Sequence, residues 1–269
     1  MKIECLLCRH SWDAPDPEIA ADCPRCGYSA AFRRLDFLFA GSCRPERCHS
    51  AENDESRYWG ELLMGRPHGF GIMHMYNGVR YEGFFRNGNY SGLGRTLVEP
   101  VKGDKKGEWY EGAYFMGRRQ GRGEAHYKSG LCYRGDFASN TETGFGTLHC
   151  PDGAVYTGEF RSGKFNGEGT LKMANGDIYT GCFLFGRFSG DGRCTYSSGG
   201  YYSGKWRDGL WNGPGELALP TGVRLRGVFS KGEIDGTFTV HRPDGSVGYG
   251  VWKNGVFQSG TGAHPAEDA

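Results

Sequence analysis

The sequence predicts an all-β protein, an elongated single-layer antiparallel β-sheet solenoid of 23-residue hairpin repeats behind a small cysteine-rich head. Three observations predict this fold class. Glycine makes up 47 of the 269 residues, where average usage would supply about 19. A Tyr-x-Gly-x-aromatic motif recurs at a fixed interval, and two C-x-x-C pairs stand near the N-terminus. With 14% aromatic residues and no running G-X-Y triplet, the chain is neither a flexible linker nor collagen.

The 23-residue interval defines eight repeats, and repeats decide the fold before any single residue does. Forty of the 47 glycines fall within residues 58–247, so the glycine excess belongs to the repeats. We count the first residue of each motif as position 1; the spacing is 23 residues except for one interval of 29 after the second repeat. Repeats 1 to 8 begin at Tyr58, Tyr81, Tyr110, Tyr133, Tyr156, Tyr179, Tyr202 and Leu225.

Inside each repeat the pattern predicts a β-hairpin. In repeat 5, Tyr156, Gly158 and Phe160 alternate with mostly polar residues, which places positions 1, 3 and 5 on one face of a half-buried strand. A second strand is expected over positions 12–18, with turns over positions 7–11 and 19–22. Glycine at position 8 supplies a positive φ, and Asn140 replaces it once. We expect the glycines at positions 3, 12 and 14 to leave room for an aromatic ring of a neighbouring strand or repeat.

These residues resemble the MORN repeat, whose pattern is Y-x-G-x-[FW]-x-x-G-x-x-x-G-x-G. The resemblance covers residues 58–257 as eight repeats and a partial ninth, with atypical terminal repeats of the kind that cap an array. It implies an elongated, twisted antiparallel sheet that serves protein binding and scaffolding. Two strands per repeat at a spacing of about 4.8 Å would make the sheet about 77 Å long.

Residues 1–50 lack the repeat and predict a small metal-bound head. Cys5 and Cys8 form one C-x-x-C pair, and Cys23 and Cys26 form a second after 14 intervening residues. Each pair offers two thiolates on one side of a tight loop, as a tetrahedral zinc site requires. The segment resembles a zinc ribbon, and we expect the four cysteines to bind a structural Zn²⁺. A redox dithiol and metal-free cysteines are the alternatives.

A further group in the head, Cys43, Cys48 and His49, is compatible with half of a second metal site or with ordinary thiols near a linker. Zinc ribbons often bind nucleic acid, but seven basic and seven acidic residues balance each other in this head. Such a balance is poor for neutralising phosphate, so we do not expect a nucleic-acid partner. Residues 51–57 are polar and predict a linker, and residues 258–269 predict a flexible tail.

Two rows of side chains between the glycines are candidate partner-binding surfaces. The first is aromatic, at position 10, and consists of Tyr90, Phe165, Phe188 and Trp211. Large apolar groups near a turn either line a peptide groove or cap the next hairpin. The second is a basic edge formed by the hairpin turns. Either it binds anionic phospholipid or an acidic partner, or its charges are only solvated. Its candidate residues are Arg161, Lys164 and Arg187.

The function predicted from the sequence is a non-enzymatic scaffold or adaptor that binds another protein through the face or turn edge of the repeat sheet. The head serves as a second interaction module. The motifs of P-loop, nucleophile-elbow and H-E-x-x-H enzymes are absent, and a net charge of +1 gives no global field. Membrane association through basic turns, nucleic-acid binding by the head and a metal-dependent activity are the alternatives. We expect a cytoplasmic protein. Peripheral membrane attachment and homodimerisation through exposed edge strands are open alternatives.

Overall fold

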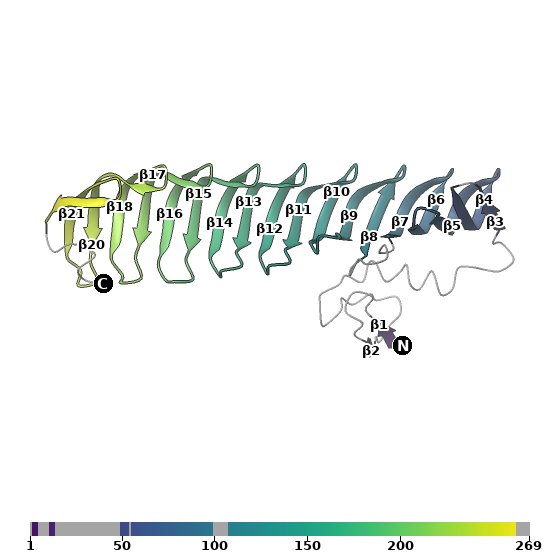
Figure 1. The fold of residues 1–269 in the computed structure, drawn as a ribbon, viewed down its shortest axis with the longest axis horizontal. Coiled ribbons are helices and arrows are strands. Elements are labelled where there is room, and N and C mark those ends of the chain that lie inside the picture. The colour runs from purple at the N-terminus through teal and green to yellow at the C-terminus, as the bar shows by residue number, and fades with distance from the viewer. Residues whose placement is uncertain (1, 5–10, 14–48, 54, 99–106, 262–269) are drawn as a thin grey trace. The chain divides into compact units, whose positions relative to one another are not determined.

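The structure is a computed structural model that describes residues 2–4, 11–13, 49–53, 55–98 and 107–261. Among these residues, no helix has the length and apolar character needed to cross a bilayer. The chain divides into two compact units. The first unit comprises Met1–Lys128 and Phe137–Asn140, and the second comprises Ser129–Asp136 and Thr141–Ala269. Each unit is built from antiparallel hairpins (Figure 1).

In the first unit, two short strands pair with each other, and seven longer strands pair each with the next in chain order. The short strands are β1 (Lys2–Glu4) and β2 (Ser11–Asp13). The longer strands are β3 (His49–Glu52), β4 (Ser56–Leu63), β5 (Arg66–Met75), β6 (Val79–Arg86), β7 (Asn89–Val98), β8 (Glu108–Phe115) and β9 (Arg118–His126).

The strand β10 (Cys132–Ala138) has residues in both units, and the strands that follow it belong to the second unit. They pair in chain order, except that β18 pairs with both β19 and β20. These strands are β11 (Thr141–His149), β12 (Val155–Arg161), β13 (Lys164–Lys172), β14 (Ile178–Leu184), β15 (Arg187–Thr195), β16 (Tyr201–Arg207), β17 (Leu210–Ala218), β18 (Arg224–Ser230), β19 (Glu233–Ile234), β20 (Gly236–His241), β21 (Val247–Lys253) and β22 (Val256–Gly260).

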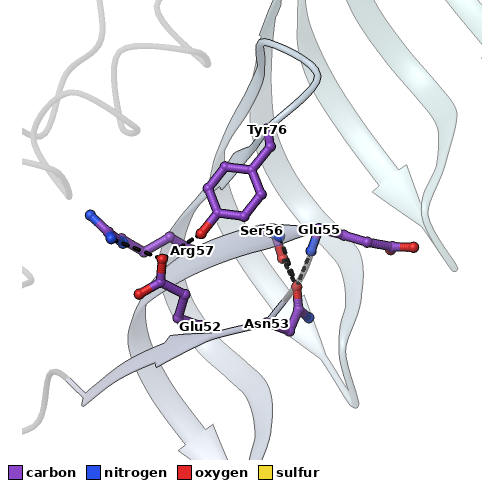
Figure 2. A network of polar contacts seen from close by, with 6 residues as sticks. All are labelled: Glu52, Asn53, Glu55, Ser56, Arg57 and Tyr76. Atoms are coloured by element: carbon purple, nitrogen blue, oxygen red, sulfur yellow. Dashed lines mark hydrogen bonds and ion pairs between the residues drawn. The ribbon is translucent and has the colours of Figure 1, made fainter.

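The repeats of the first unit are preceded by a hairpin where we expected a linker (Figure 2). The Asn53 side-chain oxygen accepts hydrogen bonds from the backbone N–H of Glu55 at 2.9 Å and of Ser56 at 2.7 Å, which turns the chain from β3 into β4. The Glu52 carboxylate accepts hydrogen bonds from Tyr76 and from Arg57, and these two donors lower its pKa. At the other end, β22 continues to Gly260, three residues beyond the predicted end of the repeats.

The core is a row of tyrosine rings that lie over glycine. The tyrosines at position 1 of repeats 2 to 7 are fully buried. In repeat 5, a Cβ added to Gly169 would lie 2.5–2.7 Å from three atoms of the Tyr156 ring, and a Cβ on Gly158 would lie 2.6 Å from its hydroxyl oxygen. Glycine at positions 3 and 14 therefore makes the space for the ring. For Gly169 the ring comes from the neighbouring strand, as the sequence predicted, whereas for Gly158 it comes from the same strand.

A β-bulge lies beside the tyrosine hydroxyl in the hairpins of repeats 1 to 3 and 5 to 7. In repeat 5 the pairs Gly158–Gly169 and Phe160–Phe165 show that the register shifts by two residues, so Glu159 of β12 stands opposite the three residues 166–168 of β13 and pairs with none of them. The Tyr156 hydroxyl donates a hydrogen bond to the Glu159 carbonyl oxygen at 2.9 Å. The same bond, from position 1 to the carbonyl of position 4, recurs in repeats 1 to 7. The tyrosine thus donates to a backbone acceptor of a residue that has no pairing partner on β13.

Other aromatic side chains enclose each tyrosine ring. In repeat 5, the Phe165 ring at position 10 stacks on the Tyr156 ring with centroids 3.8 Å apart. The position 5 rings of the same and of the next repeat, Phe160 and Phe183, meet Tyr156 edge-on at 5.1 and 5.0 Å. Such stacked and T-shaped pairs match the charge distribution of the rings. In repeats 2, 5, 6 and 7, where position 10 is aromatic, its ring therefore contributes to the core of the hairpin.

The hairpin turns are shorter than predicted. Position 7 and position 8 both have positive φ, as at Ser162 (52°) and Gly163 (72°), and the second strand begins at position 9. This is the geometry of a two-residue hairpin turn that matches the twist of the strands. Asn140 has φ of 73°, which confirms why it can replace glycine at position 8. The expectation for position 12 was wrong: Gly167 has φ of 68°, so glycine is there for its backbone conformation rather than for a ring.

Repeat 8 keeps the same packing with two residues exchanged. Position 1 is Leu225 instead of tyrosine, and position 14 is Phe238 instead of glycine. The Phe238 ring occupies the space that a Cβ on Gly227 would need, and it is buried. Phe238 also meets Phe229 and Trp252 edge-on at 4.9 and 5.7 Å. The ring over the position 3 glycine is thus supplied by the opposite strand.

Candidate partner-binding surface

The second unit has an apolar hollow of about 270 Å³ on the aromatic side of β15, β16 and β17. Four aromatic rings, two apolar side chains, a thiol and a carboxylate line it, together with two glycines. These residues are Phe188, Tyr196, Trp206, Trp211, Met173, Leu210, Cys194, Asp177, Gly209 and Gly232.

The walls of the hollow are rings held by the repeat packing. Phe188 stacks on Tyr179 with centroids 3.8 Å apart and meets Trp206 edge-on at 5.2 Å. Trp211 stacks on Tyr202 at 4.7 Å. Both stacking residues are at position 10 and are half-buried, so one side of each ring is held and another side is accessible. The rings are therefore preorganised before any partner binds.

The floor of the hollow is formed by buried side chains with little reactivity. Trp206 is buried, and its indole N–H donates to the Gly192 carbonyl oxygen at 3.0 Å. Cys194 is also buried, and burial raises the pKa of its thiol to about 11. Because only a thiolate is a good nucleophile or metal ligand, this cysteine is an apolar floor residue at neutral pH.

The rim combines an exposed leucine with one carboxylate. The Leu210 side chain is 49% exposed. Asp177 accepts hydrogen bonds from the Ser197 backbone N–H at 2.8 Å and from the Asn175 side-chain amide at 2.9 Å. These bonds hold the pKa of Asp177 below its usual range, so the carboxylate is ionised. The arrangement suits an apolar group with a positive charge beside it.

The structure brings together two of the four aromatic residues predicted for binding. Phe188 and Trp211 line one hollow, whereas Tyr90 lies in the first unit and Phe165 does not line the hollow. Tyr90 and Phe165 each stack on their own tyrosine, at 3.7 and 3.8 Å. All four belong to a strand rather than to a turn.

The three predicted basic residues are exposed at hairpin turns of the second unit. Arg161 and Lys164 pair with each other across the Ser162–Gly163 turn. Arg187 lies 3.5 Å from the Asp208 carboxylate, and both side chains are largely exposed. An exposed ion pair of this kind adds little stability.

Several residues of the hollow were missed from the sequence. Leu210 could have been found, because position 9 is otherwise polar or charged in repeats 1 to 7. Cys194 and Tyr196 carry no such signal, since they line the hollow only through the packing of neighbouring repeats. The predicted zinc ligands Cys5, Cys8, Cys23 and Cys26 lie outside the described residues, as do Cys43 and Cys48.

Comparisons with known proteins agree with the repeat. The chain is 30% identical over 110 residues to Alsin of Homo sapiens and 31% identical to Alsin of Rattus norvegicus. Each match covers 41% of this chain and 7% of the relative, so the chain spans a small part of those proteins.

Two solved structures show a weaker likeness. The TCP10 domain of Danio rerio CPAP, in complex with a peptide of Danio rerio STIL, is 14% identical with a TM-score of 0.40 over 71% of this chain and 82% of that domain. The G-box domain of the microcephaly protein CPAP is 14% identical with a TM-score of 0.42 over 73% of this chain and 100% of that domain.

The family model of the MORN repeat matches seven consecutive segments. They are residues 58–80, 81–96, 110–132, 133–155, 156–178, 179–201 and 202–224. These segments cover more than half of the chain and coincide with repeats 1 to 7, which share the buried tyrosine, its hydrogen bond to the carbonyl of position 4 and the two glycines beneath the ring. The chain therefore belongs to the MORN-repeat family.

Proposed function

We propose that this protein is a non-enzymatic scaffold that binds another protein, and that the hollow between Phe188 and Trp211 receives an apolar side chain of that partner. The observation that carries the proposal is an accessible apolar hollow whose walls are rings fixed by stacking. Aromatic residues in such positions provide most of the binding energy at protein interfaces. Membership of a repeat family is consistent with a scaffold role.

The rim defines the chemistry of the partner further. Asp177 is ionised beside the apolar walls, and Leu210 extends them into solvent. The segment that fits is therefore an apolar residue followed or preceded by lysine or arginine. The carboxylate fixes the orientation of the segment, while the rings supply the buried area.

Affinity capture with the full chain tests this proposal, using lysate of the native host and quantitative mass spectrometry. Leu210→Ser removes the exposed rim, and Phe188→Ala removes a wall. Each is expected to lower recovery of one prominent partner by at least about tenfold, the effect of losing an interface hot spot.

Phe165→Ala is the matched control for lost stability. Phe165 stacks on Tyr156 at the same 3.8 Å distance at which Phe188 stacks on Tyr179, but it does not line the hollow. Recovery should be unchanged in this variant. An equal loss in Phe165→Ala and Phe188→Ala, with Leu210→Ser unaffected, would show that the hollow is not the binding site.

The N-terminal head is proposed to be a second interaction module held by zinc. Cys5, Cys8, Cys23 and Cys26 supply four thiolates, the complete ligand set of a structural zinc site. A site filled in this way has no open position for water or substrate, which supports a structural role over a metal-dependent activity. The balanced charge of the head likewise favours a protein contact over nucleic acid.

A further inference from the structure

The second unit has another hollow, of about 560 Å³, on the face of the sheet opposite the tyrosine core. Tyr201, which lines it, directly precedes the buried Tyr202, so the two side chains point to opposite faces. The polar and aromatic side chains of this hollow are Arg193, Tyr201, Ser203, Glu216 and Arg226, and three glycines and a proline complete it. We call it the basic hollow. It shares no residue with the hollow between Phe188 and Trp211.

The charged residues of the basic hollow stand in one row across the sheet. Arg193 on β15 is opposite Ser203 on β16, which is opposite Glu216 on β17. Glu216 is in turn opposite Arg226 on β18. From β11 to β20, the other members of this row all have a hydroxyl; besides Ser203 they are Thr147, Thr157, Thr170, Thr180 and Thr239. The fold therefore does not require charged residues in the row.

Glu216 neutralises only part of the positive charge. Its carboxylate accepts hydrogen bonds from the Tyr201 hydroxyl and from Nε of Arg226. Burial alone would raise the pKa of Glu216, but these two donors outweigh it and hold the pKa below its usual range. The Arg193 guanidinium lies over the Tyr201 ring, 3.7 Å from its centre. Within the described part of the chain, neither Arg193 nor Arg224, two residues before Arg226, makes an ion pair. The basic hollow thus suits carboxylates.

Thr261, the last residue that the structure describes, ends in the same row. Its backbone N–H donates to the Tyr249 carbonyl oxygen at 2.9 Å, and its hydroxyl accepts from the Tyr249 N–H at 3.1 Å. Tyr249 is opposite Thr239, and Thr239 is opposite Arg226. Three strand spacings of about 4.8 Å therefore separate Thr261 from Arg226, or about 14 Å.

The residues after Thr261 are acidic and long enough to reach the basic hollow. Residues 262–269 contain Glu267 and Asp268 and no lysine or arginine. These two acidic residues are six and seven positions beyond Thr261, which an extended chain spans in about 20–23 Å. They reach Arg226 with slack. The Arg193 guanidinium, over a ring on β16, is five strand spacings or about 24 Å from Thr261, which an extended Asp268 reaches with its side chain.

The surface between Thr261 and the basic hollow is apolar and exposed. Tyr249 is 51% exposed and Val247 is 60% exposed. Tyr249 pairs with Thr239 of the row, so it faces the same way as the basic hollow, and so does Val247 two residues before it. Residues 262–266 have the sequence Gly-Ala-His-Pro-Ala, whose small apolar side chains can pack on this surface.

We propose that residues 262–269 cross this face of the sheet and place Glu267 and Asp268 in the basic hollow, against Arg226 and Arg193. The two carboxylates are complementary to its excess of positive charge, and the row that ends at Thr261 leads to it. An acidic segment of another protein would have to displace these residues. They therefore restrict access to the basic hollow.

Nuclear magnetic resonance of the ¹⁵N-labelled full chain tests the proposal. Glu267→Gln with Asp268→Asn removes both charges while keeping the length of the segment. This variant should shift the Nε–Hε signals of Arg193 and Arg226 and the backbone amide signals of β17 and β18.

Glu233→Gln with Asp235→Asn is the matched control. Both residues are exposed in repeat 8 and do not line the basic hollow. This variant has the same net charge as the first and should leave the two arginine signals in place.

A labelled peptide of residues 261–269 with an amidated C-terminus provides a second measurement. It should bind the chain that carries Glu267→Gln and Asp268→Asn, because the basic hollow is then vacated. Adding Arg193→Gln and Arg226→Gln to that chain should weaken peptide binding by about fivefold, the effect of losing partly exposed ion pairs. Arg193→Gln alone should weaken it less and leaves the bond between Glu216 and Arg226 intact.

The proposal is overturned if Glu267→Gln with Asp268→Asn leaves the two arginine signals unchanged, or if the control variant shifts them equally. Peptide binding without such a shift would also overturn it, because the basic hollow would then accept an acidic segment of another protein rather than residues 262–269.

Discussion

At the scale of single residues, repeats 1 to 7 each depend on a buried tyrosine. Tyr156 lies over Gly158 and Gly169, stacks on Phe165, and donates a hydrogen bond from its hydroxyl to the Glu159 carbonyl oxygen opposite the bulge. The ring, the two glycines and the bulge therefore form one packing unit. Changing any member should affect the others.

Gly169→Ala should destabilise the protein because the new Cβ would lie 2.5–2.7 Å from the Tyr156 ring. We expect the free energy of unfolding to fall by about 1–3 kcal/mol, the usual effect of overpacking. Gly186→Asn is the control, since Gly186 has φ of 86° and open space around it. That change should cost no more than about 1 kcal/mol. Urea denaturation of both variants measures the difference, and equal stability would contradict the ring-over-glycine packing.

The buried tyrosines also predict the pH dependence of stability. Burial raises the pKa of Tyr156 and Tyr202 to about 12, whereas an unfolded tyrosine ionises near pH 10. The folded state thus retains protons that the unfolded state releases. This stabilisation is complete below about pH 10 and is lost as the pH rises toward 12.

We expect the urea midpoint to be nearly constant from pH 7 to pH 9 and to fall steeply above about pH 10. Tyrosinate absorbance should rise together with unfolding rather than before it. Ionisation of most tyrosines near pH 10 in the folded protein would contradict their burial.

At the scale of the repeat, the eighth hairpin shows that the ring can come from either strand. Leu225 and Phe238 exchange the roles of the tyrosine and of the position 14 glycine, and Phe238 fills the space above Gly227. The two positions are therefore coupled across the hairpin. A repeat should accept the exchange only when both residues change.

The exchange can be built into repeat 5 as Tyr156→Leu with Gly169→Phe. Each single substitution should destabilise by at least about 2 kcal/mol, through a cavity or through overpacking. The double variant should be more stable than the sum predicts by about 1–3 kcal/mol. Tyr156→Leu with Gly215→Phe, in separate repeats, should be additive. Additivity in repeat 5 as well would contradict a shared ring site.

The zinc site of the head is predicted from the sequence. Four cysteines in two pairs predict that the full chain contains about one zinc ion. Cys23→Ser with Cys26→Ser should abolish zinc binding, whereas Cys182→Ser, in β14, should retain it. Elemental analysis of the purified chain measures this directly. A metal-free unmodified chain would contradict the zinc-ribbon interpretation.

At the scale of the whole molecule, the sequence predicted those features that a recurring residue type marks. Asn140 marked a left-handed turn position because few residues other than glycine accept it, and the ring-over-glycine core followed from the period of aromatic residues. The bulge was not predicted, although it includes the position 12 glycine that repeats 1 to 7 share, because that glycine was assigned to ring packing rather than to its positive φ, which is 68° at Gly167. Because the bulge was not foreseen, the turn was predicted to extend over positions 7–11, and position 10 was placed in that turn rather than in the second strand.

The binding hollow was predicted only in part, for a related reason. Phe188 and Trp211 belong to a repeated row that the sequence shows, but Cys194 and Tyr196 line the hollow through contacts between repeats. In a repeat protein, the residues that all repeats share thus indicate the core, and the residues that differ between repeats indicate the binding surfaces.

Hydrogen–deuterium exchange of the full chain, with and without a captured partner, tests the central claim most directly. If the partner occupies the hollow, amides of β15 and of the turn and strand at 207–214 should exchange more slowly in the complex. The equivalent amides of β12 and β13, which have the same packing but do not line the hollow, should be unchanged. Protection confined to other segments, with β15 and β17 unaffected, would contradict the account.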